Sequence, residues 1–389
     1  MTAKVFVHIG PHKSGTTFLQ QVLAANKAAL AANGMLFPGK SYSRQRRALE
    51  KLLRSSGGKS RQAGQWRALA REVARWQGDI AVLSNESICT AGLPPISMLV
   101  ESLAPAEVHV VYTARDFTKV IPAMWHTQMR NQRTKSWETY LRTVRGDPAA
   151  LSAWGRRVWS AQDPREVFGR WEQLVPRTHI HVVTVPPSGT APDVLWERFC
   201  AAIGMDPAPY SLEVRRLNES LGTAEVEVLR RINARVEGRI SKSGYNRWIQ
   251  VFAARRVLEH RPEQTKFALP VEEHGWIRTR AEEIIGFLEE GGYSVTGDLH
   301  DLLPAPVSAT AVRPDEVDLE QALDAAVDVI AGLLETLDEK ATRARSGGRG
   351  VLPAPGRAAA AKVVRRVRSS VAARLGRSSG PLARWHRRR

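Results

Sequence analysis

Eight residues near the start of the chain, positions 10–17, combine glycines, hydroxyls and one lysine in the order Gly-Pro-His-Lys-Ser-Gly-Thr-Thr. An apolar run of strand type at 5–9 precedes them, and a helical pattern of apolar residues begins near Thr16. A strand, a glycine-containing loop and a helix in this order point backbone N–H groups and the positive end of a helix dipole at one spot. The sequence therefore predicts a site for a phosphate or a similar anion.

The spacing of this loop differs from that of the ATP-binding loop, Gly-x-x-x-x-Gly-Lys-Ser/Thr. Gly10 and Gly15 have the right separation, but Thr16 stands in the place of the lysine, and the lysine lies inside the loop at position 13. The loop resembles the 5′-phosphosulfate loop of the sulfotransferase family, whose members carry sequences such as Gly-Pro-x-Lys-Ser/Thr-Gly-Thr-Thr. A plain glycine turn between a strand and a helix is the simpler alternative.

The resemblance implies a PAPS-dependent enzyme, which moves a sulfuryl group from 3′-phosphoadenosine 5′-phosphosulfate (PAPS) to a hydroxyl or amine. It also implies that Lys13 stabilises the leaving phosphate, so that no metal ion is required. The expected donor-binding residues are His12, Lys13, Ser14, Gly15, Thr16, Thr17 and Arg115. His12 is equally compatible with an exposed orientation.

Arg115 is the residue that the resemblance assigns to the 3′-phosphate of the donor. Related chains usually carry a serine eight residues after this arginine, whereas this chain has Ala123. Thr118, Lys119 or a basic residue from elsewhere could replace the missing hydroxyl. Two later segments are candidates for a further donor-contacting loop, residues 215–222 and 242–244.

Glu86 is the expected general base, because it lies at the end of a buried strand that begins near residue 79. Burial beside an acceptor raises the pKa of a carboxyl group towards the range that a base needs. The alternative is that Glu86 is a carboxylate at a helix N-terminus or a partner of Arg115. Lesser candidates for the base are His12, His109, His126 and Asp116.

Apolar runs of strand type alternate with helical patterns along most of the chain. This alternation predicts an α/β fold with a parallel sheet flanked by helices on both faces, and the resemblance implies the P-loop sulfotransferase-like version of it. Ligands of such sheets bind beyond the carboxyl ends of the strands. The polar segments 10–17, 84–86 and 113–116 are therefore expected to face one crevice.

The composition predicts four parts in the chain, namely an α/β domain at 1–303, a linker at 304–314, an acidic amphipathic helix at 315–341 and a basic Gly/Pro/Arg-rich linker and tail at 342–389. The amphipathic helix is expected to pack its apolar stripe on the domain or, alternatively, on a second copy in a homodimer.

Basic charge is concentrated in the tail. Residues 343–389 hold 14 Lys/Arg and no Asp/Glu, whereas the rest of the chain holds 43 basic and 39 acidic residues. The net charge of +18 therefore says little about the main domain, and no specific nucleic-acid partner is expected. The tail could hold the protein peripherally at an anionic membrane, or it could remain solvated.

Cysteine usage and hydropathy bear on the compartment. Two cysteines in 389 residues exclude a disulfide framework and a cysteine-rich zinc site. The sequence has no apolar run of about 18 residues, which is the length of a membrane span, and it enters its first strand too early for a signal peptide. We expect a cytoplasmic protein, with the tail able to reach the inner face of the membrane.

Two other functions stay open on the sequence. A P-loop kinase or NTPase would need a lysine after Gly15 and a metal-binding aspartate at a strand end, to which Asp116 is a poor fit. A non-catalytic polyanion- or membrane-binding protein would be built around the tail. For the enzyme, the expected acceptor is a small molecule, a sugar or a lipid-linked compound. The tryptophans at 125–171 could stack on such rings, although core packing explains them more simply.

Overall fold

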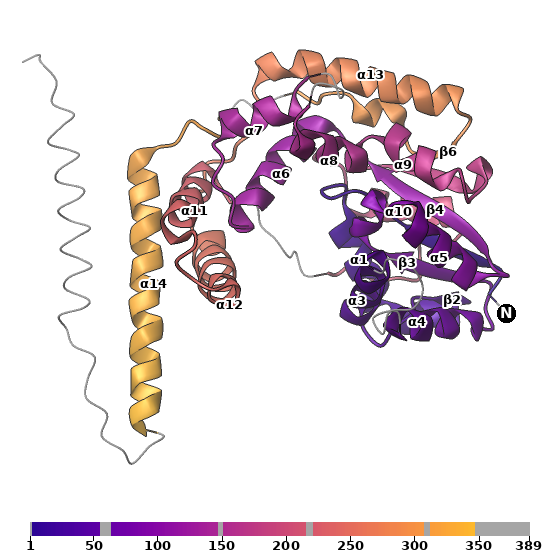
Figure 1. Cartoon of the computed structure of the whole chain (residues 1–389), viewed down its shortest axis with the longest axis horizontal. Coiled ribbons are helices and arrows are strands. Elements are labelled where there is room, and N and C mark those ends of the chain that lie inside the picture. Colours follow the sequence, from indigo (N-terminus) through magenta and orange to yellow (C-terminus); the bar gives the residue numbers. More distant parts are fainter. Residues whose placement is uncertain (1, 55–63, 147–150, 215–220, 307–311, 347–389) are drawn as a thin grey trace, which may run out of the picture. The chain divides into compact units, whose positions relative to one another are not determined.

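The computed structural model describes residues 2–54, 64–146, 151–214, 221–306 and 312–346 (Figure 1). By its internal contacts the chain divides into two units, Met1–Ile330 and Ala331–Arg389. The first unit holds the sheet and the site discussed below. Residues 347–389 of the basic linker and tail, and residues 215–220 of one predicted donor loop, lie outside the described residues.

The described part of the chain contains one sheet of six parallel strands in the order β2-β3-β1-β4-β5-β6. The strands are β1 (Lys4–His8), β2 (Met35–Leu36), β3 (Ile80–Ser84), β4 (Glu107–Ala114), β5 (Ile180–Thr184) and β6 (Ser294–Thr296). The predicted α/β fold with a parallel sheet is confirmed. After β1 the chain forms β2 and β3 on one side of it, and then β4, β5 and β6 on the other side. The direction of strand addition therefore reverses between β1 and β4, and the crevice for a ligand is expected between these two strands.

Helices flank the sheet on both faces (Figure 1). Side chains alternate along each strand, so Phe6 packs with α1 and α10 on one face, and Val5 and Val7 point to the other. Among the helices that contribute to the two cores are α1 (Thr16–Ala25), α3 (Tyr42–Leu53), α4 (Gly64–Ala74), α5 (Leu93–Leu103), α9 (Pro164–Trp171), α10 (Asp193–Ile203) and α13 (His274–Glu290).

The helix that follows the loop, α1, is shorter than the apolar pattern in the sequence, which continues to Leu30. It ends at Ala25, and a separate helix α2 (Lys27–Ala32) follows. Asn26 lies between them and donates from Nδ2 to the carbonyl of Val22 and to that of Ser211. Asparagine competes for backbone hydrogen bonds in this way, which explains why the helix is interrupted there.

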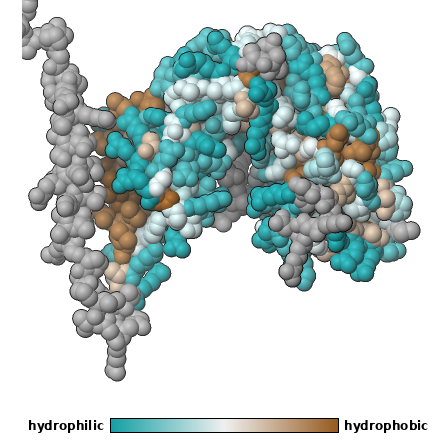
Figure 2. Space-filling view, in the orientation of Figure 1, coloured by the Kyte–Doolittle hydropathy of each residue, from teal (hydrophilic) through white to brown (hydrophobic). Residues whose placement is uncertain are grey.

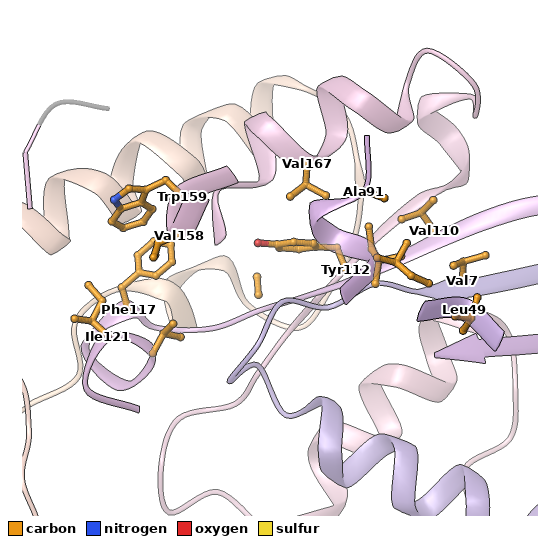
Figure 3. Close-up of a cluster of buried hydrophobic side chains, with 14 of the residues drawn as sticks. Val7, Leu49, Ala91, Val110, Tyr112, Phe117, Ile121, Val158, Trp159 and Val167 are labelled. Carbon is orange, nitrogen blue, oxygen red and sulfur yellow. The ribbon is translucent and has the colours of Figure 1, made fainter. Parts of the chain in front are cut away.

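Four of the tryptophans at 125–171 belong to the core. Trp125, Trp137, Trp159 and Trp171 are all buried. Figure 3 shows part of this layer, where Phe117 lies beside Trp159 with ring centroids 5.1 Å apart. These four side chains are therefore not exposed to stack on an acceptor, which supports the simpler interpretation.

A second group of helices surrounds the region beyond the strand ends. It comprises α6 (Phe117–Arg130), α7 (Trp137–Val144), α8 (Ala153–Gln162), α11 (Thr223–Val236), α12 (Lys242–Tyr245) and the π-helical segment η5 (Asn246–Val257). The chain between η5 and α13 pairs with residues after 303, since the amide of Ala268 donates to the carbonyl of Val312 at 3.1 Å. Residues 304–306 and 312–330 thus belong to the same compact unit as the sheet.

The long helix α14 (Leu319–Ser346) buries small residues and exposes large ones. Ala322 and Ala325 face inwards, whereas Leu319 is 64% exposed and Val327 is 52% exposed. Figure 2 shows apolar side chains on the surface of this helix. The predicted apolar stripe therefore does not pack on the domain through Leu319 or Val327. None of the described helices combines the length and apolar character needed to cross a bilayer.

Candidate anion-binding site

Buried hydrogen bonds to β4 hold the loop that follows β1. Ser14 Oγ donates to the carbonyl of Pro11 at 2.7 Å and lies 2.6 Å from Thr113 Oγ1. The serine side chain is fully buried, so it fixes the loop and does not face a ligand. Any role of Ser14 in donor binding would have to use its backbone.

Backbone geometry explains the two glycines of the loop. A Cβ at Gly10 would lie 1.9 Å from Thr113 Oγ1, so only glycine lets the loop pass this close to β4. Gly15 has φ +80°, in the left-handed region that favours glycine. Lys13 also has a positive φ, 75°, which is uncommon for a residue with a side chain.

Two side chains from other parts of the chain donate hydrogen bonds to the carbonyls of His12 and Lys13. Arg115 donates from Nη1 to the carbonyl of Lys13 at 2.9 Å, and Gln162 of α8 donates from Nε2 to the carbonyl of His12 at 2.9 Å. A left-handed residue of this kind costs about 1–3 kcal/mol and persists where its surroundings impose it. The loop is therefore fixed in shape before any ligand arrives.

The N-terminus of α1 offers backbone donors. Within the described residues, no hydrogen-bond acceptor contacts the amides of Gly15, Thr16 or Thr17, and Gly15 provides no side-chain cap. Thr16 is buried and Thr17 is exposed. Unsatisfied amides at a helix N-terminus are suited to an oxyanion.

A cavity of about 830 Å³ lies next to this loop and to the first residue after β4. The basic residues that line it are Lys13, Arg115, Lys119, Arg130, Arg255 and Lys266. Among the described lining residues, none is an aspartate or a glutamate. Positive charges gathered in this way repel one another, and a polyanion would relieve that repulsion.

The pKa values of Lys13 and Arg115 are lowered in this basic and largely buried environment. Burial, together with the charges of Arg130 and Arg115, lowers the pKa of Lys13 to about 8. Burial also lowers the pKa of Arg115, although Asp116 acts in the opposite direction. A bound anion would favour the charged form of Lys13 and raise its pKa again.

His126 lines the cavity as a neutral side chain. Burial, followed by the charges of Arg130, Lys13 and Lys266, lowers its pKa well below the ordinary value. Its Nε2 accepts a hydrogen bond from Arg130 Nε at 3.1 Å. Arg130 in turn forms an ion pair with Glu259, so the two neighbours orient its guanidinium.

The structure narrows the candidates for the hydroxyl missing at Ala123. Thr118 Oγ1 donates to Asp116 Oδ2 at 2.5 Å, so this hydroxyl is already engaged. Asp116 caps α6 by accepting from the amide of Thr118, and it also accepts from the amide of Ala305, which leaves it unsuited to be a base. Lys119 lines the cavity one helical turn before Ala123 and is the remaining candidate among the residues named.

Glu86 does not line this cavity. It is the first residue of a short 3-10 helix, η2 (Glu86–Thr90), and its Oε2 accepts from Gln20 Nε2 of α1 at 3.0 Å. Desolvation by the surrounding atoms lowers the pKa of His12, and the charge of Glu86 acts in the opposite direction. The His12 side chain lies on the loop with part of its surface open to solvent, although neighbouring atoms surround much of the ring. Glu86 thus lies beside the loop near His12, hydrogen-bonded to Gln20.

Two other predicted residues lie away from the cavity. His109 is near the amino end of β4, and its Nδ1 lies 3.0 Å from Nε2 of His181, so it cannot be the base. Residues 242–244 do not line the cavity either. Lys242 is exposed and begins the short helix α12. The segment 215–220 is outside the described residues, but Leu221 directly after it does line the cavity.

Sequence reasoning missed three basic residues of the cavity, which are Arg130, Arg255 and Lys266. Arg130 could have been found, because Lys119, Ala123, His126 and Arg130 follow Arg115 at helical spacing on one face of α6. Nothing in the local sequence of Arg255 or Lys266 indicates the cavity, since tertiary packing brings them there.

Comparisons with known proteins give limited results. No protein-family model and no curated protein matches the chain. Among solved structures, a sulfotransferase from Alicyclobacillus acidocaldarius is similar with 13% identity and a TM-score of 0.35, over 63% of this chain and 100% of that one. The sulfotransferase domain from the curacin biosynthetic pathway is similar with 11% identity and a TM-score of 0.33, over 57% of this chain and 80% of that one. At TM-scores this low, the function has to be inferred from the residues of the chain itself.

Proposed function

We propose that the protein is a PAPS-dependent sulfotransferase. The observation that carries the proposal is the position of Lys13, which lies inside the anion loop and beside Arg115 in a cavity with six basic lining residues. A donor with a phosphosulfate and a separate phosphate would place negative charge at more than one point of such a cavity. The buried cations would then be neutralised by the substrate.

In this proposal the loop binds the 5′-phosphosulfate. The amides of Gly15, Thr16 and Thr17 donate to its oxygens, and Lys13 stabilises the charge that develops on the leaving phosphate. Arg115 and Lys119 hold the 3′-phosphate, with the lysine taking the place of the hydroxyl missing at Ala123. This assignment needs no metal ion, because lysine supplies the positive charge.

The proposed transfer is a direct displacement. The acceptor oxygen or nitrogen attacks sulfur, and the bond between sulfur and the bridging oxygen breaks. 3′-Phosphoadenosine 5′-phosphate (PAP) leaves with the electron pair, and the proton of the acceptor passes to Glu86. Gln20 holds the carboxylate of Glu86, and the exposed His12 beside it suggests that the acceptor enters on this side of the loop. We expect a small molecule, a sugar or a lipid-linked acceptor there.

A kinase or NTPase is the rival that shares this type of loop. It would bind magnesium and nucleotide through a loop lysine after the second glycine and a carboxylate at a strand end. The described lining residues include no carboxylate, and the carboxylate of Asp116 is taken up by α6 and by Ala305. These features favour a donor that carries its charge without a metal.

Calorimetric titration tests the proposal. We expect the protein to bind PAP in the presence of EDTA more tightly than it binds ATP with magnesium. Lys13→Ala should weaken PAP binding, whereas Lys242→Ala, which removes an exposed lysine outside the cavity, should leave it unchanged. Tighter binding of magnesium–ATP would instead favour the kinase.

Transfer itself is measured with ³⁵S-labelled PAPS. The acceptors to be screened are simple phenols, free sugars and extracted lipids, and labelled product should form in at least one class. Lys13→Ala serves as the inactive control. Labelled product that forms equally with Lys13→Ala would remove the loop from the mechanism.

A further inference from the structure

A second cluster of titratable side chains lies at the amino end of the sheet, away from the cavity. It consists of Glu107 and His109 of β4, His179 at the end of the 3-10 helix η4 (Arg177–His179), and His181 of β5. Parallel pairing places His109 beside Phe6 and His181 beside Val111, so these side chains share one face of the sheet. The proposed transfer reaction uses none of the four residues.

The side chains of the cluster approach one another closely. Nε2 of His109 lies 3.5 Å from a carboxylate oxygen of Glu107, and the rings of His109 and His179 stack with centroids 4.1 Å apart. One ligand atom each from Glu107, His109 and His179 can be chosen so that all three lie within 4.8 Å of one another. Donors around a tetrahedral Zn²⁺ lie about 3.4 Å apart, given Zn–N distances of about 2.0–2.1 Å. The three donors would therefore have to move closer together, and His179 would have to rotate out of its stack on His109.

His109 is the buried member of the cluster, with 6% of its surface exposed. Its Nε2 makes no hydrogen bond to the described residues, although a carboxylate oxygen of Glu107 lies 3.5 Å from it. A buried polar atom without a partner is costly and calls for an explanation.

We propose that Glu107, His109 and His179 bind a divalent transition-metal ion of the Zn²⁺ type. Imidazole nitrogens and a carboxylate are the ligands that Zn²⁺ takes in proteins, and a fourth position would be left for water. His109 would coordinate through Nε2, while its Nδ1–H donates to Nε2 of His181, 3.0 Å away. A ligating histidine is commonly oriented by such a bond from its other nitrogen.

The ion would join β4 to the segment that leads into β5. Glu107 is exposed and His179 is half-buried, so both can adjust to the metal, whereas His109 is held against Phe6 with ring centroids 4.9 Å apart. The charge of Lys4, which is in register with Glu107, opposes a cation here. The site is proposed to stabilise the fold, and no reaction is assigned to it.

The experiment uses the full-length protein without a polyhistidine tag, treated with EDTA and then titrated with Zn²⁺ in a calorimeter. We expect one Zn²⁺ per chain and a rise in Tm when Zn²⁺ is added, because a ligand that binds the native state stabilises it. His179→Gln and Glu107→Gln should each weaken Zn²⁺ binding at least tenfold and reduce the rise in Tm. These two side chains are not fully buried, so the variants should fold.

His260→Gln is the matched control, because it removes an exposed histidine outside the cluster and should leave binding unchanged. Co²⁺ substitution gives a second readout, since a tetrahedral site with nitrogen and oxygen ligands absorbs visible light. The proposal is overturned if the wild-type protein takes up no Zn²⁺. It is equally overturned if His179→Gln and Glu107→Gln bind Zn²⁺ as tightly as the wild type does. Neither readout depends on sulfuryl transfer.

Discussion

The cavity has two walls that are built in different ways. The loop wall consists of Lys13, which comes from the loop at 10–17, and Arg115. Short hydrogen bonds such as that between Ser14 and Thr113 hold this loop. The helical wall consists of five side chains from α6 and later segments, namely Lys119, His126, Arg130, Arg255 and Lys266. The loop that carries Lys13 also leaves backbone amides free at the start of α1, whereas the helical wall offers mainly long cationic side chains.

This difference separates two tasks. A rigid set of donors stabilises a developing charge well, because it needs no reorganisation during the reaction. Long side chains attract and hold a polyanion but fix its position less sharply. We therefore expect changes in the loop wall to affect turnover most and changes in the helical wall to affect donor affinity most.

The largest effect is expected outside both walls, at Glu86. Glu86→Gln should reduce turnover about 10²- to 10⁴-fold, because general base catalysis is lost. PAP affinity should stay unchanged, since Glu86 does not line the cavity. Steady-state kinetics and PAP titration of the same preparation check this. Full activity of Glu86→Gln would move the base to His12, the nearest alternative.

The loop wall is tested by Lys13→Ala. Turnover should fall more than about tenfold, which corresponds to about 1.4 kcal/mol in the barrier. The loss in turnover should exceed the loss in PAP affinity, because the charge of Lys13 matters most when the phosphate leaves. Single-turnover rates and PAP titrations of the wild type and the variant give the two losses. A larger loss in affinity than in turnover would contradict the assignment of catalysis to the loop wall.

The boundary between the walls is tested by Arg115→Ala and Lys119→Ala. Each should weaken PAP binding by roughly tenfold or more, since a hydrogen bond to a charged group contributes about 1.5–3 kcal/mol. Lys119→Ala should leave binding of AMP, which lacks the 3′-phosphate, unchanged. Arg115→Ala should weaken AMP binding as well, because Arg115 also holds the carbonyl of Lys13. Equal losses for PAP and AMP in Lys119→Ala would show that this lysine does not contact the 3′-phosphate.

A smaller effect is expected at the outer part of the helical wall. Arg255 is exposed and lines the cavity, while the adjacent Arg256 is exposed and does not. Arg255→Ala should weaken PAP binding up to about fivefold, as expected for an exposed charge contributing no more than about 1 kcal/mol. The difference from wild type should shrink at high salt. Arg256→Ala is the control, and an equal loss in it would indicate a general effect of net charge.

The two walls also differ in how far the sequence predicts them. The loop lies within a single strand–loop–helix unit, so glycine spacing and the position of Lys13 were enough to locate it. Arg115 could be placed because the ends of parallel strands meet at one edge of the sheet. Arg255 and Lys266 come from segments whose packing against α6 is not encoded in any local pattern.

Side-chain contacts reveal roles within the protein that the residue type alone does not indicate. Ser14, Thr118 and Asp116 have the residue types of a ligand site, yet their side chains bond within the protein. His109 is close to Arg115 in the sequence, but about 3.3 Å of rise per residue along β4 takes it well away from the site. In each case the residue type was informative, and the direction of the side chain decided its role.

The smallest expected effect follows from the pKa of Lys13, which is about 8 in the free protein. A bound anion raises that pKa, so PAP binding above pH 8 requires uptake of a proton and becomes weaker as the pH rises. Near pH 7 the lysine is already mostly charged, so its protonation adds little further affinity below that pH. Between pH 7 and pH 8.5 the charged fraction falls about fourfold, and PAP affinity should fall by the same factor. Phosphate groups, with a second pKa near 6, are ionised throughout this range.

Titrations of wild type and Lys13→Ala across these pH values separate the contribution of the lysine, since the variant should show no such decline. A decline of equal size in the variant would assign the proton to another group of the cavity.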